Sequence, residues 1–203
     1  LIKDKEEIAC LQKAAKLGCE GYKHVVSLLK EGITEQELAF ELEFFWKKQG
    51  AKRLAFDSII AFGANGSKPH YRAGTAKLTP NTSVLIDIGV VLAHYHSDMT
   101  RTLFFGTPPP LIQTIYAIVE ETKERALALC RPGMLVGELD RAAREWITAK
   151  GYGDFFTHSL GHGLGLDIHE PPIVRDTGLY RTLPLQAGMV ITIEPGIYLP
   201  NVG

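Results

Sequence analysis

Apolar residues recur at the spacing of an amphipathic helix in four stretches of the chain. The predicted helices cover residues 3–29, 34–50, 111–129 and 137–150. Thr34 and Glu37 have the spacing of a capping box, so we expect the second helix to begin at Thr34. Gly50 and Gly151 stand at the ends of the second and fourth helices, where glycine commonly terminates a helix. The helices therefore come in two pairs, each ended by a glycine.

Two apolar stretches, residues 56–62 and 84–102, have the composition of β-strands. The second reads VLIDIGVVLAHYHSDMTRT and carries Asp87 and Asp98. If the chain reverses at Leu92–Ala93, the two aspartates lie opposite each other on antiparallel strands, with Cβ atoms about 5 Å apart. Carboxylates this close repel unless a cation lies between them or one is protonated. The hairpin therefore predicts a cation site; the alternative is that one aspartate caps a strand and the other faces solvent.

The two helical pairs are related by a constant spacing in the sequence. Gly32, Glu37, Leu38 and Gly50 recur as Gly133, Glu138, Leu139 and Gly151, each 101 residues later. The segment 85–89 also resembles the segment 192–196, which makes Asp87 and Glu194 equivalent positions. We therefore predict an α+β fold of two related halves that face each other, with an acidic residue from each at the centre.

Residues 158–170, HSLGHGLGLDIHE, gather three histidines and three glycines in thirteen positions. Gly161, Gly163 and Gly165 allow the backbone to come close to a site, and His162 is the histidine best placed to reach it. A phosphate site is disfavoured, because no GxGxxG or GK[ST] motif follows. His70 lies in a second loop, residues 63–74, that is rich in Gly, Asn and Pro; a lone loop histidine is usually only solvated.

Charge and composition exclude several classes of function. The chain has 22 basic and 23 acidic residues, so there is no electrostatic case for nucleic acid or an anionic membrane as partner. No apolar run reaches the 18 or more residues of a membrane span. Cys10, Cys19 and Cys130 form no CxxC pair. Three unpaired thiols suit a reducing, cytoplasmic location.

Asp87, Asp98, His162 and Glu194 together offer three carboxylates and one imidazole. This set favours a pair of divalent first-row ions over a structural zinc, which more often takes thiolates. Oxygen-rich ligation points to manganese, with cobalt or zinc as substitutes. Two ions about 3.5–4 Å apart need bridging carboxylates, and we count one ligand fewer than the five expected.

The motifs DIG, YHSDMTRT, HSLGHGLGLDIHE and IEPGIY together resemble those of the pita-bread dinuclear metallopeptidases. Within that group, PHY at residues 69–71 and HSLGHGLGLDIHEPP are similar to the Xaa-Pro aminopeptidases and Xaa-Pro dipeptidases. The resemblance implies a pita-bread (creatinase/aminopeptidase) fold, with two pseudo-symmetric α+β halves, antiparallel sheet and outer helices. It also implies that residues 1–203 are a catalytic domain truncated at its C-terminus, with the family's N-terminal domain absent from the chain.

The resemblance implies a role for each matched residue. Asp87 would hold one metal ion, Asp98 would bridge two, and His162 and Glu194 would hold the other, with Glu194 also a candidate proton shuttle. The outer histidines would bind substrate and stabilise the tetrahedral intermediate; they are His70, His158 and His169. Tyr198 matches a tyrosine near the metal site. The fifth ligand is expected to be a Glu beyond Gly203.

The function implied is hydrolysis of the bond between an N-terminal residue and a following proline, by an Xaa-Pro aminopeptidase. The alternatives are an Xaa-Pro dipeptidase, a non-catalytic binding module on the same fold, and a creatinase-like amidinohydrolase. The expected partner is a peptide with proline in second position, and the full-length protein is expected to be a homo-oligomer.

Overall fold

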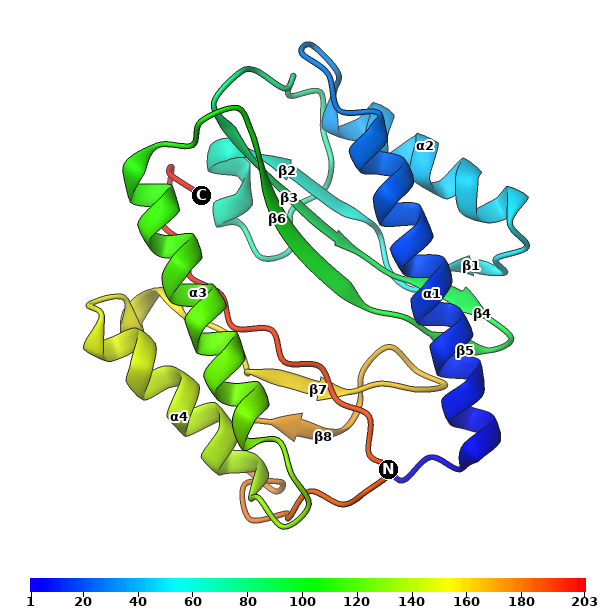
Figure 1. The fold of residues 1–203 in the computed structure, drawn as a ribbon, viewed down its shortest axis with the longest axis vertical. Helices are drawn as coiled ribbons and strands as arrows, with labels where there is room; N and C mark the ends of the chain where they lie inside the picture. The colour runs from blue at the N-terminus through cyan, green and yellow to red at the C-terminus, as the bar shows by residue number, and fades with distance from the viewer. The chain divides into compact units, whose positions relative to one another are not determined.

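A computed structural model describes residues 1–203, which divide into two compact units (Figure 1). Unit 1 comprises Leu1–Ile8 and Thr114–Ile197, and unit 2 comprises Ala9–Gln113 and Tyr198–Gly203. Each unit contains an antiparallel sheet and helical segments that precede it in the chain. The expected α+β class is therefore present in both.

The four predicted helices are all found. They are α1 (Lys5–Ser27), α2 (Glu35–Lys48), α3 (Pro110–Leu129) and α4 (Val136–Ala149), with two short 3-10 turns at η1 (Gly63–Ser67) and η2 (Gly153–Phe155). The predicted capping box is confirmed: the Glu37 N–H donates to Thr34 Oγ1 at 3.1 Å, and the Thr34 N–H donates to Glu37 Oε2 at 2.8 Å. Gly50 and Gly151 follow α2 and α4 with φ of 85° and 86°, the left-handed conformation that ends a helix.

Unit 2 is built on two small antiparallel sheets. Their strands are β1 (Arg53–Leu54), β2 (Ile59–Phe62), β3 (Thr82–Ile88), β4 (Val90–Leu92), β5 (Tyr95–His96) and β6 (Met99–Phe105). One sheet has the order β2–β3–β6 and the other β1–β4–β5. Val84, Ile86 and Ile88 alternate along β3 and are fully buried in a core that includes Leu38 and Trp46 of α2. Because strand side chains alternate, Asp87 points to the opposite face of the sheet.

The predicted hairpin exists, but the predicted register was wrong, because the turn lies one residue later than expected. The chain reverses at Ala93–His94, with Leu92 paired to Tyr95, instead of at Leu92–Ala93. Asp87 consequently lies opposite Thr100, not Asp98. A tight hairpin turn needs positive φ at both central residues, and here Ala93 (49°) and His94 (72°) supply it without glycine or asparagine.

Asp98 lies outside the strands, at the bend where the hairpin leaves one sheet for the other. Gly89 makes this bend possible, because a Cβ atom there would lie 2.3 Å from the Ser97 carbonyl oxygen. The ladder continues through the bend, with the Ser97 N–H donating to Val90 O at 2.9 Å. Asp98 precedes Thr100, the partner of Asp87, by two residues and is therefore displaced along the hairpin from the predicted position.

Unit 1 contains a shorter hairpin of β7 (Gly161–Gly163) and β8 (Glu170–Val174), beside α4 (Figure 1). The segment 190–194 runs along the other side of β7. The Thr192 N–H donates to His162 O and the Glu194 N–H donates to Leu160 O, both at 2.8 Å. Of these residues only Ile191 makes a β-bridge. In the segment 192–196, which resembles residues 85–89, Thr192 and Glu194 bond to the backbone at β7 without forming a regular strand.

The glycines of residues 161–165 serve close packing of backbone on backbone and on Glu170. A Cβ atom on Gly161 would lie 2.0 Å from Thr192 O, and one on Gly163 would lie 2.3 Å from Pro171 O. A Cβ atom on Gly165 would meet the Glu170 carboxylate at 2.5 Å. Within unit 1 the glycines therefore bring neighbouring segments against β7; the approach of this backbone to a functional site stays a prediction.

Each unit contains the same pair of backbone hydrogen bonds, and the residue numbers in the two units differ by constant offsets. The Gly32 N–H donates to Leu78 O at 2.9 Å, and the Gly133 N–H donates to Leu185 O at 2.8 Å. The residues of the second bond follow those of the first by 101 for the donor and 107 for the acceptor. The same two offsets relate the pairs Leu78–Ile33 and Leu185–Met134, both at 2.8 Å.

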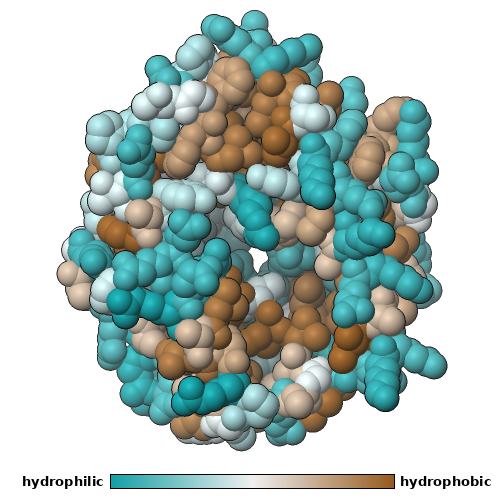
Figure 2. Space-filling view, viewed as in Figure 1, coloured by the Kyte–Doolittle hydropathy of each residue, from teal (hydrophilic) through white to brown (hydrophobic).

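On the face drawn in Figure 2, hydrophilic residues cover much of the surface, with apolar residues visible between them. None of the helices combines the length and the apolar composition needed to cross a bilayer.

Cys10, Cys19 and Cys130 form no disulfide, as predicted.

Candidate functional site

In unit 1, His162 and Glu194 face each other. His162 Nδ1 lies 2.9 Å from the Gly163 carbonyl oxygen. Because a carbonyl only accepts, Nδ1 carries a proton, and in the neutral ring Nε2 bears the lone pair. Nε2 lies 3.2 Å from Glu194 Oε1. Two electron-rich atoms at this distance must share a proton or a cation.

Glu194 is further held by Thr192, whose Oγ1 donates to Glu194 Oε1 at 2.7 Å and accepts from the His162 N–H at 3.0 Å. Burial alone would raise the pKa of Glu194. Hydrogen bonds from His162 and Thr192 outweigh burial and hold this pKa below its ordinary value. Thr192 therefore fixes both candidate ligands at once, which is the role of an outer-shell partner in a metal site.

The two outer histidines of unit 1, His158 and His169, pack against different rings. The His169 ring is exposed and meets the His162 ring edge-on, with centroids 4.4 Å apart. The His158 ring is half-buried and meets the Phe156 ring edge-on at 5.2 Å. His158 Nδ1 lies 2.7 Å from the Ser159 carbonyl oxygen, so this nitrogen is a donor.

In unit 2, the candidate ligands lie on one hairpin. Thr100 Oγ1 donates to Asp87 Oδ1 at 2.9 Å across the β3–β6 pair. Asp98 follows the bend at Ser97 and is half-buried. Each unit thus presents one acidic residue bonded by a threonine hydroxyl, Asp87 by Thr100 and Glu194 by Thr192.

His70 is exposed in the turn that follows η1. Its loop is tied down by Glu35, a fully buried carboxylate at the start of α2. Glu35 accepts hydrogen bonds from the Phe62 N–H, Asn65 Nδ2, Tyr71 Oη and the Gly74 N–H at 2.7–3.1 Å. Burial, together with the hydrogen bond to Glu35, raises the pKa of Tyr71 to about 12. Tyr198, also in unit 2, is half-buried.

The four candidate ligands are thus divided between the units, with Asp87 and Asp98 in one and His162 and Glu194 in the other. Neither unit by itself holds a group of three or more metal-ligating side chains. The chemistry of the donors fits divalent cations: carboxylate oxygens and an imidazole whose other nitrogen is already committed to a carbonyl.

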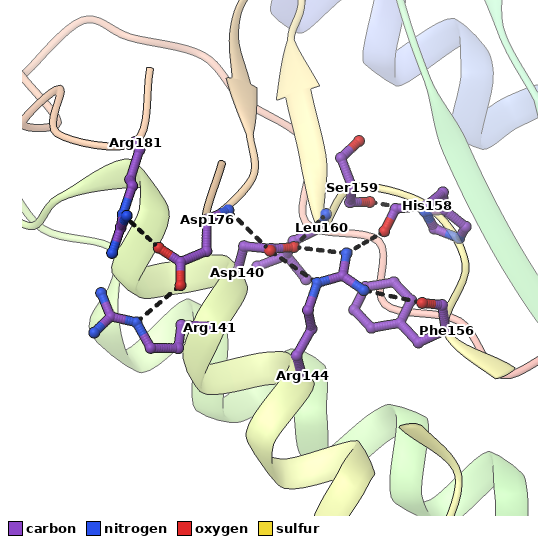
Figure 3. Close-up of polar contacts among 9 residues, drawn as sticks. All are labelled: Asp140, Arg141, Arg144, Phe156, His158, Ser159, Leu160, Asp176 and Arg181. Atoms are coloured by element: carbon purple, nitrogen blue, oxygen red, sulfur yellow. Dashed lines mark hydrogen bonds and ion pairs between the residues drawn. The ribbon is translucent and has the colours of Figure 1, made fainter. Parts of the chain in front are cut away.

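Thr100, Thr192, Glu35, Asp140 and Arg144 were not predicted from the sequence. Asp140 and Arg144 of α4 bond to the backbone around His158 (Figure 3). A signal for Asp140 was present: it is a charged residue within the apolar stripe of α4, flanked by Val136 and Ala143, with an arginine four positions later. A charge on the buried face of a helix indicates a specific partner.

Residues 9–203 match the model of metallopeptidase family M24. The chain belongs to this family. A curated relative, the Xaa-Pro dipeptidase of Pyrococcus furiosus, is 44% identical over 203 residues, which is 100% of this chain and 58% of that protein. The M24 assignment agrees with the resemblance inferred from the sequence motifs.

Solved structures of M24-like peptidases have the same fold as this chain. The prolidase from Pyrococcus furiosus gives a TM-score of 0.95 at 44% identity, over 100% of this chain and 59% of that one. The X-Pro aminopeptidase from Thermotoga maritima gives 0.93 at 38% identity, over 99% and 56%. The chain therefore spans somewhat more than half the length of the relatives it matches.

Proposed function

We propose that this chain is the catalytic domain of an Xaa-Pro dipeptidase, which hydrolyses the bond between an N-terminal residue and a C-terminal proline. The observation that carries the proposal is the His162–Glu194 pair, whose facing Nε2 and Oε1 atoms must share a proton or a cation, a position that a divalent ion would fill. The relative with 44% identity over the whole chain is named an Xaa-Pro dipeptidase, which favours this alternative over the aminopeptidase. An aminopeptidase is the second candidate, supported by the similarity to the Thermotoga maritima structure.

We propose that Asp87, Asp98, His162 and Glu194 hold two divalent ions, with Asp98 as the bridging ligand. Support comes from the donor chemistry of these side chains and from the threonine hydroxyls that orient the Asp87 and Glu194 carboxylates. Manganese as the metal, a homo-oligomeric full-length protein and a cytoplasmic location remain predictions from the sequence.

The repeated hydrogen bonds support an internal repeat in which Asp87 and Glu194 are equivalent. These two residues differ by 107, the offset found for Leu78 and Leu185. We infer two pseudo-symmetric halves, each of which contributes one threonine-bonded carboxylate to the site. An internal repeat explains why a carboxylate occupies both position 87 and position 194, although Asp87 lies in the regular strand β3 and Glu194 lies in no regular strand.

Bound divalent ions would supply a water of lowered pKa and a Lewis acid for the scissile carbonyl. The exposed His169 imidazole would donate a hydrogen bond to the carbonyl oxygen as negative charge develops there, with His70 and His158 binding the substrate. Glu194 would accept and return the proton of the attacking water, because hydrogen bonding keeps it ionised near neutral pH. The peptide bond that precedes proline has no N–H, so the substrate must be bound through side chains that do not accept a hydrogen bond from that nitrogen.

Hydrolysis by the full-length protein, supplied with Mn²⁺, tests the proposal. The substrates are an Xaa-Pro dipeptide, an Xaa-Pro-Xaa tripeptide and an Xaa-Ala dipeptide. The dipeptidase predicts the highest kcat/KM for Xaa-Pro and little turnover of Xaa-Ala. Preference for the tripeptide would favour the aminopeptidase, and the absence of turnover on all three by metal-loaded protein would favour a binding module. Asp87→Asn serves as the inactive control.

A further inference from the structure

A buried ion pair on α4 organises the chain around His158. Asp140 is only 1% exposed, and its carboxylate accepts four hydrogen bonds (Figure 3). Two come from Arg144, from Nε at 2.9 Å and Nη2 at 3.0 Å. The other two come from the backbone N–H groups of Leu160 and Asp176, both at 3.0 Å. Because Leu160 precedes β7 and Asp176 follows β8, one carboxylate holds both open ends of the hairpin.

Arg144 uses its remaining donors on the same stretch of chain. Its Nη1 donates to Phe156 O at 2.9 Å, and its Nη2 donates to His158 O. The guanidinium also lies over the Phe156 ring, 4.4 Å from its centroid. That ring in turn meets the His158 imidazole edge-on. Arg144 thus contacts the peptide of His158 directly and its side chain through Phe156.

The bonded groups fall on alternate residues: the carbonyls of Phe156 and His158, and the N–H of Leu160. His162 comes next at the same spacing, at the centre of β7. Leu160 leads directly into β7, so a shift of the anchored peptides displaces the backbone that carries both imidazoles. Helix stability alone would not require the two bonds to carbonyls, because the i,i+4 pair with Asp140 is already complete.

We propose that Asp140 and Arg144 are positioning residues that fix the backbone of residues 156–160 and so aim the His158 and His162 imidazoles. The proposal rests on the proposed function of those histidines. Lysine cannot replace Arg144 here, because an ammonium group has no planar fork to reach the Asp140 carboxylate and two carbonyls at once. A misplacement of about 1 Å can cost roughly 10²-fold in rate.

The test compares Arg144→Lys with Arg141→Lys in the full-length protein. Arg141 lies on the same helix and its Nε is 3.1 Å from Asp176 Oδ2, but it makes no bond to residues 156–160, so it is the matched control. We expect Arg144→Lys to lower kcat on an Xaa-Pro dipeptide about 100-fold. We expect Arg141→Lys to keep wild-type kcat. Urea unfolding of both variants separates misplacement from loss of fold.

Two further readouts distinguish positioning from a general structural role. Millimolar guanidinium should restore part of the kcat of Arg144→Ala, since it can occupy the vacated site, and should leave Arg141→Ala unchanged. Independently of turnover, the ¹⁵N resonances of the His158 and His162 rings should shift in Arg144→Lys and in Asp140→Asn. Unchanged ring resonances in both variants, or wild-type kcat in Arg144→Lys, would overturn the proposal. If the wild type hydrolyses no Xaa-Pro substrate, the proposed function fails, and the ring resonances alone decide the positioning role.

Discussion

The imidazole Nε2 of His162 lies 3.2 Å from Oε1 of Glu194. Gly163 holds the other ring nitrogen as a donor, and Thr192 holds the carboxylate. The pair is thus oriented by neighbours on both sides. This arrangement distinguishes residues that would touch a metal ion from residues that would touch substrate, and the distinction can be measured.

His169→Ala is expected to leave bound metal unchanged. The exposed ring lies beside His162 without being part of the proposed ligand set. Loss of one donor to a developing oxyanion lowers kcat roughly 10²- to 10³-fold. His70→Ala should act in the same direction but more weakly, because His70 is proposed to bind substrate, whereas His169 is proposed to donate to the developing oxyanion. Steady-state kinetics and metal analysis on the same preparations check this, and loss of metal from His169→Ala would contradict it.

Thr192→Val and Thr100→Val should each weaken metal binding. Both hydroxyls donate to a proposed ligand carboxylate, at 2.7 Å to Glu194 and at 2.9 Å to Asp87. Loss of such an outer-shell partner costs about 10- to 100-fold in metal affinity. Competition with a metal-binding dye measures the change in the full-length protein. Thr107→Val, at an exposed position, is the control and should bind as the wild type does.

Glu35→Gln should destabilise unit 2 and loosen the His70 loop. The amide would present a donor to a site where four donors already converge, so at least one buried hydrogen bond is lost. The expected loss is about 2–3 kcal/mol in the free energy of unfolding. Urea titration measures it, and hydrogen exchange at the Gly74 N–H reports the loop. Glu41→Gln, exposed on the same helix, should change neither.

Lys3→Met should make stability depend differently on pH. Lys3 Nζ lies 2.7 Å from Glu170 Oε2, with the two side chains 5% and 18% exposed. Burial raises the pKa of Glu170, but the bond from Lys3 and a backbone bond outweigh it, so this pKa lies below its ordinary value. A lowered carboxylate pKa contributes stability that is present above the unfolded-state pKa, about 4.3, and is lost as pH falls through the folded-state pKa.

The variant should therefore be less stable than the wild type by about 3 kcal/mol at pH 7. The difference should shrink as pH falls below about 4.3 and through the lowered folded-state pKa, at which Glu170 of the wild type becomes protonated. Urea unfolding across this pH range measures the difference. A constant difference at all pH values would show that Lys3 acts through packing of its side chain and not through its charge.

Local features of this fold could be predicted from the sequence, whereas features set by a distant partner could not. The capping box at Thr34 and the terminating glycines at Gly50 and Gly151 depend on neighbouring residues only, and all were found where expected. The hairpin register depended on its turn. Ala93 and His94 adopt left-handed conformations without the glycine or asparagine that usually mark them, so the turn was placed one residue early.

The missed residues act across long separations in sequence. Glu35 reaches Tyr71, 36 positions away, and Asp140 reaches Leu160, 20 positions away. Periodicity identifies which face of α4 is buried, but it does not show which backbone groups a buried carboxylate meets.

Metal content of the full-length protein tests the central claim most directly. Wild-type protein and His162→Ala are dialysed against the same Mn²⁺ buffer, and bound metal per chain is measured by mass spectrometry. We expect two ions per wild-type chain and fewer in His162→Ala, with turnover of an Xaa-Pro dipeptide falling in parallel. Equal metal content in the two proteins would contradict the assignment of His162 as a ligand, and with it the proposed site.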